Sequence, residues 1–307
     1  MSQFQSILMP LGLTDNDADA IRYAGFISRM VGVNTFYFVH VNNSLEIPKE
    51  ILAEHPNLLP PLDEGLERDM KVLVERNFGE NLSQMECSYK AMEGQLVAEV
   101  LRYASIKDVD LILSGTSREA ERSSTITTSL ARKASCPVLS VPYGHKPSIK
   151  TLGCPMDFSR HSERAFATAL ELANQGRARL VCIHAYDVPR NFAKARKSHE
   201  EFAAIMKAHA QHEFGKLMST FHCDPSQVTC EYVLNGHPPA AIHEVLNRTG
   251  IDMLVIGSRG HGAVASMVLG SVAEEILLTA KIPVMAVKEK GDNASFLKLF
   301  FNEADIG

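Results

Sequence analysis

The sequence predicts an α/β fold of two repeated, Rossmann-like domains, each built on a five-stranded parallel sheet. Three observations carry this prediction. The chain has 307 residues, of which 45% are hydrophobic and 22% charged, as suits two ordinary globular domains. Short apolar runs alternate with amphipathic helical segments, a pattern typical of parallel sheets covered by helices on both faces. The same order of segments then recurs in the second half of the chain.

Each half opens with a strand, a turn and an amphipathic helix. Residues 5–28 correspond in this way to residues 150–173. The matched turn residues are Pro10 with Pro155 and Thr14 with Ser159. This correspondence predicts that the two halves begin with the same βα unit.

The second strand of each half, at 34–41 and 178–185, carries a histidine before its last residue. We expect these histidines, His40 and His184, to be hydrogen-bonded groups of the core rather than acid–base catalysts. The later elements match in three further pairs, which are Gly94 with Gly236, Asp110 with Asp252, and Gly115 with Gly257.

A variable helical stretch separates the second and third strands, at 56–78 in the first half and as a long helix from about Ala193 to Phe221 in the second. A linker is expected at 143–150, where Pro, Gly and charged residues stand between two apolar strands. We therefore expect a first domain at 1–145, a second at 146–290 and a C-terminal tail at 291–307.

A glycine-rich segment follows the fourth strand of the second half, with the spacing Gly257-x2-Gly260-x9-Gly270-Ser271. Glycine lets the backbone approach another molecule closely, and a helix N-terminus offers unpaired N–H groups with a partial positive charge. The segment therefore predicts a cradle for an anion, above all phosphate. In a parallel sheet it lies beyond the carboxyl ends of the strands, where ligands bind.

Three other phosphate motifs fit less well. A Walker A loop requires Gly-x4-Gly-Lys-Ser/Thr, which the sequence lacks. Residues 260–265 satisfy the dinucleotide pattern G-x-G-x-x-A, but one strand and a tail follow them, which leaves no room for a nicotinamide half. Enzymes that cleave the α,β bond of ATP carry a Ser-Gly-Gly turn after the first strand, and neither half has that turn.

The glycine spacing, with its preceding apolar strand and the following Ile-Pro-Val, resembles the nucleotide site of the universal stress protein family. Residues 154–165 similarly resemble the opening Asp turn of that family, and the duplication is similar to its tandem, two-domain members. The resemblance covers almost the whole chain, but its sharp motifs lie in the second half. It implies binding of ATP, or of ADP or AMP, with Mg as a further candidate partner.

The resemblance assigns the base and the sugar to four residues of the second half. Asp157 and Ala185 would contact adenine, and Pro155 would line the same slot. Gly257 would lie against the ribose, because a Cβ atom there would crowd the sugar.

The same resemblance assigns the phosphates to the glycine-rich segment. Ser258, Arg259 and Gly260 would begin the loop around them, with Arg259 as a charge partner. The helix N-terminal amides that would bind the phosphates belong to Gly270, Ser271 and Val272. The alternative is a purely structural turn with a Gly cap and a Ser N-cap.

The first half departs from this pattern at the critical positions. The replacements are Gly12 for Asp157, Arg118 for Gly260, and Ser124-Thr125 for Gly270-Ser271. Its loop is also shorter and cannot surround a triphosphate. We therefore expect a degenerate domain without an intact nucleotide site, which binds at most a small anion at the hydroxyls of 123–125 and serves as a pairing partner.

The composition of the chain limits which classes of molecule it is expected to bind. A net charge of -5 with no basic cluster argues against nucleic acid as a partner. No apolar run approaches the ~20 residues of a membrane span, and the N-terminus lacks a secretory signal, so we expect a cytoplasmic protein. Six cysteines without a CxxC pair predict free, reduced thiols. Apolar edge strands that end both halves predict that the halves pair within the chain, with a homodimer as a further option.

No catalytic or metal-binding residue is predicted. His209 and His212 are spaced i, i+3, but the sequence identifies no further metal ligands, and it contains no G-x-S-x-G motif of a serine nucleophile.

The expected function is that of a stress-response protein that binds an adenine nucleotide in its second domain as a signal rather than as fuel. Two rivals stay open, a slow ATPase or nucleotide-processing enzyme of the same architecture, and a nucleotide-free interaction module that binds another small ligand.

Overall fold

The computed structural model describes residues 4–42, 63–117, 120–192, 196–221, 223–260 and 269–288. These residues form two compact units, the first within Met1–Pro147 and the second at Ser148–Lys288. The C-terminal tail expected at 291–307 lies outside the described residues.

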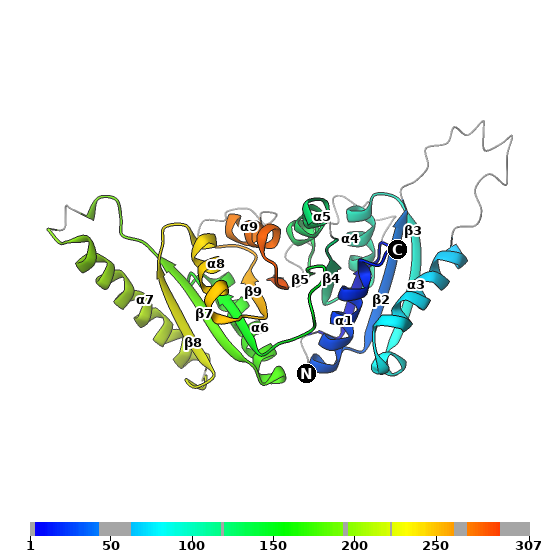
Figure 1. The fold of residues 1–307 in the computed structure, drawn as a ribbon, viewed down its shortest axis with the longest axis horizontal. Helices are drawn as coiled ribbons and strands as arrows, with labels where there is room; N and C mark the ends of the chain where they lie inside the picture. Colours follow the sequence, from blue (N-terminus) through cyan, green and yellow to red (C-terminus); the bar gives the residue numbers. More distant parts are fainter. Residues whose placement is uncertain are drawn as a thin grey trace, which may run out of the picture. The chain divides into compact units, whose positions relative to one another are not determined.

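The first unit alternates strands and helices around one parallel sheet (Figure 1). Its strands are β1 (Ser6–Pro10), β2 (Thr35–Asn42), β3 (Glu86–Glu93), β4 (Leu111–Gly115) and β5 (Val138–Val141). Its helices are α1 (Asp17–Val31), α3 (Asp63–Asn77), the short 3₁₀ helix η1 (Glu80–Gln84), α4 (Leu96–Ile106) and α5 (Ala120–Lys133). The strands pair in parallel in the order β3-β2-β1-β4-β5.

The second unit repeats this order of elements. Its strands are β6 (Thr151–Pro155), β7 (Arg179–Tyr186), β8 (Val228–Leu234), β9 (Met253–Gly257) and β10 (Val284–Val287). Its helices are α6 (Arg160–Gly176), α7 (His199–Phe221), α8 (Pro238–Thr249) and α9 (Ser271–Thr279). The strands pair in parallel in the order β8-β7-β6-β9-β10, so the prediction of two repeated five-stranded parallel-sheet domains is confirmed.

Burial explains why these short apolar runs form central strands. Every residue of β6, β9 and β10 is buried, as expected for parallel strands covered on both faces. The order of strands reverses between β6 and β9, because the chain moves from β6 to β7 and β8 on one side and returns through β9 and β10 on the other. A crevice for ligands is expected at this switch point, beyond the carboxyl ends of both strands.

The long helix of the second unit begins later than the sequence analysis expected. Helix α7 begins at His199, whereas the prediction placed its start near Ala193. A capping box explains the difference, since the Glu201 N–H donates to the Ser198 hydroxyl (3.1 Å) and the Ser198 N–H donates to the Glu201 carboxylate (2.8 Å). The signal, Ser-x-x-Glu, is visible in the sequence at 198–201.

The predicted equivalence of His40 and His184 is confirmed by their hydrogen bonds. Nδ1 of His40 donates to the Leu11 carbonyl oxygen at 2.8 Å, and Nδ1 of His184 donates to the Met156 carbonyl oxygen at 2.8 Å. Each histidine thus holds the residue that follows the first strand of its unit, as expected of a hydrogen-bonded core group.

Asp110 and Asp252 have the same structural role, one in each unit. Oδ2 of Asp110 accepts hydrogen bonds from the N–H groups of Gln5 and Ser6, both at 3.0 Å. Oδ2 of Asp252 likewise accepts from the N–H groups of Lys150 (2.7 Å) and Thr151 (2.8 Å). In each unit one carboxylate therefore anchors the entry into the first strand.

We expect the Asp252→Ala substitution to lower the free energy of unfolding of the second unit by about 2 kcal/mol, because it leaves two N–H groups at the start of β6 without their charged acceptor. Asp110→Ala should have the same effect on the first unit. Urea denaturation followed by hydrogen–deuterium exchange would assign each loss to its unit. The control is Glu244→Ala, on an exposed position of α8; a loss as large in the control as in the two aspartate variants would contradict the anchoring role.

Helix α1 packs closely on the end of α3 in the first unit. A Cβ atom built on Gly25 would lie 1.9 Å from the carbonyl oxygen of Phe78, a distance that real Cβ atoms never show. The ring of Phe78 packs edge-on against Phe36 of β2, with 5.0 Å between ring centroids. Glycine at position 25 therefore lets α1 approach this aromatic part of the core.

Candidate functional site

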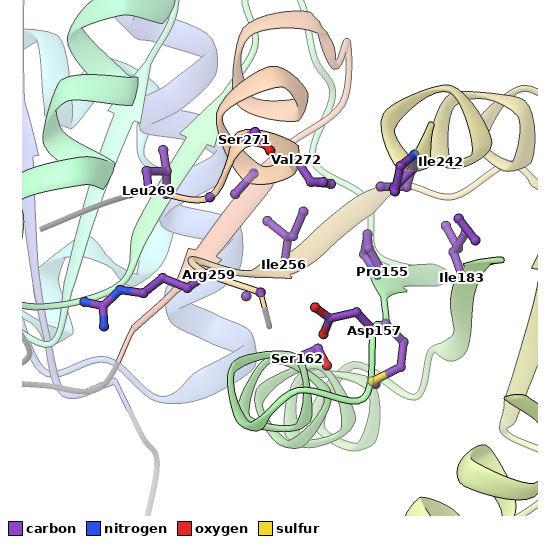
Figure 2. Close-up of a pocket in the computed structure, with 17 residues that line it drawn as sticks. Pro155, Asp157, Ser162, Ile183, Ile242, Ile256, Arg259, Leu269, Ser271 and Val272 are labelled. Carbon is purple, nitrogen blue, oxygen red and sulfur yellow. The ribbon is translucent and has the colours of Figure 1, made fainter. Parts of the chain in front are cut away.

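A pocket of about 460 Å³ opens in the second unit at the carboxyl ends of β6, β7 and β9. The first turns of α8 and α9 complete its wall (Figure 2). Its position is the switch point between β6 and β9, and its volume lies in the range of small-molecule sites.

The structure brings together nine of the ten residues predicted for the site. The nine that line the pocket are Pro155, Asp157, Ala185, Gly257, Arg259, Gly260, Gly270, Ser271 and Val272. The tenth, Ser258, is fully buried, and its N–H donates to the Val287 carbonyl at 3.1 Å. Ser258 therefore secures the end of β9 instead of lining the pocket.

The turn after β6 places a carboxylate in the pocket. Phe158 adopts a positive φ of 60°, which folds the chain back so that the Ser159 N–H donates to Oδ1 of Asp157 at 3.0 Å. The hydroxyl of Ser159 then caps α6 by accepting a hydrogen bond from the Ser162 N–H. The turn itself thereby orients Asp157, whose Oδ2 faces Gly260.

Two glycines of the pocket lie close to neighbouring groups, the backbone of α6 at Gly257 and the movable end of the Asp157 side chain at Gly260. A Cβ atom would lie 2.8 Å from the His161 carbonyl oxygen at Gly257, and 2.8 Å from Oδ2 of Asp157 at Gly260. The group that crowds Gly257 is the backbone of α6. The need for glycine at position 257 therefore comes from the backbone of the protein itself, whereas the sequence had suggested contact with a ribose as the reason.

Helix α9 begins at the pocket without a side-chain cap. Gly270 is its N-cap residue, in an extended conformation with φ -63° and ψ 145°. The Gly270 N–H donates to the Ser258 carbonyl at 2.8 Å, which fixes the start of the helix beside the end of β9. Figure 2 shows Ser271 and Val272 on this first turn, next to the pocket. Helix N-terminal amides attract anions, so this turn is suited to a phosphate group.

Arg259 and Asp157 supply the charges of the pocket lining. Among the seventeen described lining residues they are the two with charged side chains. Figure 2 shows the guanidinium group of Arg259 pointing away from Asp157, toward the side of Leu269. A positive and a negative group thus lie at different ends of the site.

The pocket also has an apolar wall that the sequence analysis missed. Ile183 lies two residues before Ala185 on β7, and Pro238 and Ile242 are spaced i, i+4 at the start of α8. The periods of strand and helix place each pair on one face, so the predicted Ala185 already implied Ile183. The α8 residues gave no such signal, because only the tertiary fold brings α8 to the switch point.

His184 lies behind the Asp157 turn. Its ring centroid is 4.8 Å from that of Phe158, and its Nδ1–H is held by the Met156 carbonyl. Burial lowers the pKa of His184 below its usual 6.5, and the hydrogen bond to Met156 opposes that effect. The neutral ring is therefore part of the support of the site.

We expect the second unit to lose stability as the pH falls below 6.5 toward the lowered pKa of His184. In that window the unfolded chain binds a proton at this histidine and the folded unit does not, so protons favour unfolding. The measurement is the urea midpoint of the second unit at pH 7 and at about pH 5.5. His184→Asn keeps a donor for Met156 and should weaken the pH dependence; an unchanged dependence would contradict the assignment.

The first unit has a carboxylate at the equivalent turn, supplied by a different residue. Asp17, in the first turn of α1, accepts hydrogen bonds from the N–H groups of Gly12 (3.1 Å) and Thr14 (2.9 Å). Burial raises the pKa of this carboxyl group, and its backbone hydrogen bonds oppose the rise. Thr14 matches Ser159, so the same amide is bonded to a carboxylate in both units. The replacement of Asp157 by Gly12 is thus compensated within the turn.

Helix α5 of the first unit includes the later part of the segment that corresponds in sequence to the glycine-rich segment of the second. It begins at Ala120, five positions before Thr125, the residue that matches Ser271 at the start of α9. The N–H groups of Ser124 and Thr125 are therefore bonded within the helix and form no cradle. Arg118 lies outside the described residues.

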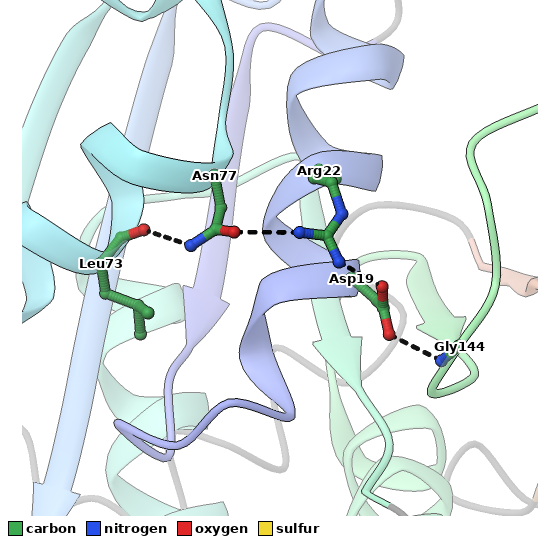
Figure 3. Close-up of polar contacts among 5 residues, drawn as sticks. All are labelled: Asp19, Arg22, Leu73, Asn77 and Gly144. Atoms are coloured by element: carbon green, nitrogen blue, oxygen red, sulfur yellow. Dashed lines mark hydrogen bonds and ion pairs between the residues drawn. The ribbon is translucent and has the colours of Figure 1, made fainter.

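Polar contacts in the first unit tie α1 to its neighbours (Figure 3). The Arg22 guanidinium donates to Asp19 and to Oδ1 of Asn77 (3.0 Å), and the Asn77 amide donates to the Leu73 carbonyl (2.9 Å). Asp19 also accepts from the Gly144 N–H at 2.7 Å. Together these bonds join α1 to α3 and to the segment after β5.

The remaining predictions concern thiols, metals and membranes. All six cysteines are free, as expected. Cys154, Cys182 and Cys230 lie in register on β6, β7 and β8, where burial raises the pKa of each thiol and disfavours the reactive thiolate. Within the described ranges, no three His, Cys, Asp or Glu side chains are grouped to hold a metal ion. No helix in the described part of the chain has the length and apolarity needed to cross a membrane.

Comparison with known proteins adds an independent finding. Residues 148–288 match the family model described as the universal stress protein family. A universal stress protein from Thermus aquaticus is 33% identical over 145 residues, which cover 98% of that protein and 45% of this chain.

Solved structures share the fold over nearly the whole chain. A protein of unknown function from Pseudomonas aeruginosa is similar over 97% of this chain and 98% of its own, with a TM-score of 0.68 and 14% identity. A universal stress protein from Archaeoglobus fulgidus is similar over 94% of this chain and 99% of its own, with a TM-score of 0.61 and 18% identity. At such low identity these two structures speak for the fold alone.

Proposed function

Because this chain belongs to the universal stress protein family, we propose that its second unit binds an adenine nucleotide, ATP, ADP or AMP, as a regulatory ligand. The observation that carries the proposal is the pocket in which the Asp157 turn, the end of β9 and the open N-terminus of α9 meet. This combination offers an acceptor, close backbone approach and an anion cradle within one site of about 460 Å³.

The geometry suggests a place for each part of the nucleotide. The apolar slot between Pro155, Ile183 and Ala185 suits a flat base, with the Asp157 carboxylate at its edge. The phosphates then reach the amides of Gly270, Ser271 and Val272.

We further propose that one nucleotide binds per chain and that the chain is a tandem universal stress protein whose first unit is degenerate. In the first unit, α5 begins at Ala120, five positions before Thr125, which matches the first residue of α9. Pairing of the two units within the chain and formation of a homodimer belong to the same proposal. The stoichiometry of a nucleotide titration and the mass of the particle in solution test these points.

We propose binding without appreciable turnover. The carboxylate that lines the pocket, Asp157, already accepts a hydrogen bond from its own turn and lies at the end proposed for the base rather than for the phosphates. Two rivals make different predictions. A slow ATPase would form ADP or AMP at a rate abolished by Asp157→Ala, and a nucleotide-free interaction module would bind no nucleotide at all.

The deciding experiment is calorimetric titration of the full chain with ATP, ADP and AMP, with GTP as the comparison. The proposal expects saturable binding of an adenine nucleotide at one site per chain and weaker binding of GTP. Absence of heat with every adenine nucleotide would overturn it and favour the interaction module. Product analysis by chromatography on the same samples separates a binding protein from an ATPase.

A further inference from the structure

Three cysteines form one row across the sheet of the second unit. Cys154 on β6 is in register with Cys182 on β7, and Cys182 is in register with Cys230 on β8. Residues in register on neighbouring parallel strands direct their side chains to the same face of the sheet. Burial raises the pKa of the Cys182 thiol, and the nearby thiols of Cys154 and Cys230 raise it further. The three sulfur atoms therefore lie side by side, one strand apart.

The corresponding row of the first unit holds no thiol. It lies one residue before the end of β1, as the cysteine row does for β6, and consists of Met9, Phe38 and Tyr89 in register on β1, β2 and β3. The rings of Phe38 and Tyr89 are stacked, with 5.3 Å between their centroids. The fold thus fills this row with large side chains in one unit, and the row of sulfur atoms is particular to the other.

The spacing of the row fits two sulfur atoms bound to one metal ion. Neighbouring strands lie about 4.8 Å apart. A metal–thiolate bond is about 2.3 Å long, as for zinc, so two such bonds in a straight line span about 4.6 Å. A disulfide would instead require the two Cβ atoms to approach to about 3.8 Å, which is closer than the strands themselves. The register therefore favours a bridging ion over a covalent bridge.

The number of available ligands selects the kind of metal. Among the residues that the structure describes, no three His, Cys, Asp or Glu side chains are grouped to hold an ion. A tetrahedral zinc site, which needs four ligands, is therefore not expected at this row. Copper(I) is a soft ion that prefers thiolates, and it can be held by two of them in a line.

We propose that Cys182 and Cys230 bind one soft metal ion, copper(I), in two-coordinate geometry. The ion replaces the two thiol protons, which pass to the solvent, and no electron is transferred. Cys230 is half-buried and gives the ion access to the row, whereas Cys154 is fully buried. Burial raises the pKa of Cys230 to about 12, but the hydrogen bond from the Tyr232 hydroxyl opposes the rise and favours the thiolate that the ion requires.

The test is anaerobic titration of the reduced full chain with copper(I), buffered by a chromophoric chelator whose absorbance reports the transfer. The proposal expects one ion per chain, because Cys182 is shared by both neighbouring pairs of the row. It also expects Cys230 to be protected from iodoacetamide in the loaded protein, and zinc to give no such protection. Absence of one-to-one transfer, or equal alkylation of Cys230 with and without copper(I), would overturn the proposal.

Variants of the row isolate the two ligands. Cys230→Ala and Cys182→Ala should each abolish the one-to-one binding. The matched control is Cys87→Ala, which removes a half-buried thiol from the edge strand β3 of the first unit. Cys87 also accepts a hydrogen bond from a tyrosine, Tyr89, but its neighbour in register is Phe36.

The control should bind copper(I) as the wild type does. Undiminished binding by a folded Cys230→Ala protein, or an equal loss in Cys87→Ala, would overturn the proposal. Circular dichroism verifies the fold of each variant. The protection of Cys230 in the wild type is independent of whether any variant folds.

Discussion

Gly260→Arg is expected to abolish nucleotide binding, with an affinity at least about a hundredfold lower than that of the wild type. A Cβ atom at this position would already lie 2.8 Å from Oδ2 of Asp157, and the arginine side chain would extend into the space proposed for the nucleotide. The effect comes from the size of the new side chain and not from the backbone conformation, since Gly260 is not among the described residues with positive φ. Calorimetry with AMP and ATP measures the effect.

The fold should survive this substitution, because Gly260 is a half-exposed loop position and the atom that a Cβ would meet is the end of the Asp157 side chain, which can shift. Gly215→Ala is the matched control, since nothing lies within 4 Å of a Cβ atom at Gly215 and the position is inside α7. The control should bind as the wild type does. Undiminished binding by a folded Gly260→Arg protein would place the nucleotide elsewhere and refute the proposed site.

Gly25→Ala is expected to give the largest loss of stability, a net decrease of about 2 kcal/mol in the free energy of unfolding of the first unit. Alanine in a helix gains about 1 kcal/mol over glycine, but the clash of its Cβ with the Phe78 carbonyl costs about 3 kcal/mol or more. The crowding atom belongs to the backbone, so relief requires α1 and the end of α3 to separate. That movement would strain the hydrogen bond from Arg22 to Asn77.

Gly65→Ala is the control for this variant, because nothing lies within 4 Å of a Cβ atom at Gly65 in α3. It should leave the first unit unchanged or slightly more stable. Hydrogen–deuterium exchange during urea denaturation reports each unit separately, and five of the seven tyrosines lie in the first half of the chain, so tyrosine fluorescence follows mainly that unit. Equal stability of Gly25→Ala and the wild type would show that α1 can shift freely.

The repeat made the fold predictable, and the family resemblance carried by the glycine spacing and the Asp turn made most residues of the pocket predictable. Gly257 is fixed by its contact with the His161 backbone, so a glycine is needed at this position regardless of the ligand. Asp252 and Asp110 could be matched for a similar reason, since each anchors the first strand of its unit through backbone N–H groups. Constraints of this kind involve neighbouring backbone groups, so they are visible as the same residue types at matching positions of the two halves.

The features that could not be predicted depend on residues from other positions in the chain. Asp17 takes the place of a missing carboxylate from a position five residues away from Gly12, so a residue-by-residue match could not find it. Ile242 reaches the pocket only because α8 packs beside the switch point. Helix α5 begins early, at Ala120, within a stretch of 116–143 that has no glycine, whereas the corresponding part of the second unit contains Gly260, Gly262 and Gly270.

Under the proposed function, the five additional residues at the start of α5 limit how the chain can respond to a nucleotide. A molecule with one competent pocket follows a simple hyperbola, which needs roughly two decades of ligand concentration to pass from nearly empty to nearly full. No homotropic cooperativity can arise inside a single chain of this kind. A sharp threshold in the cell would therefore have to be created by association between chains, and it would disappear on dilution.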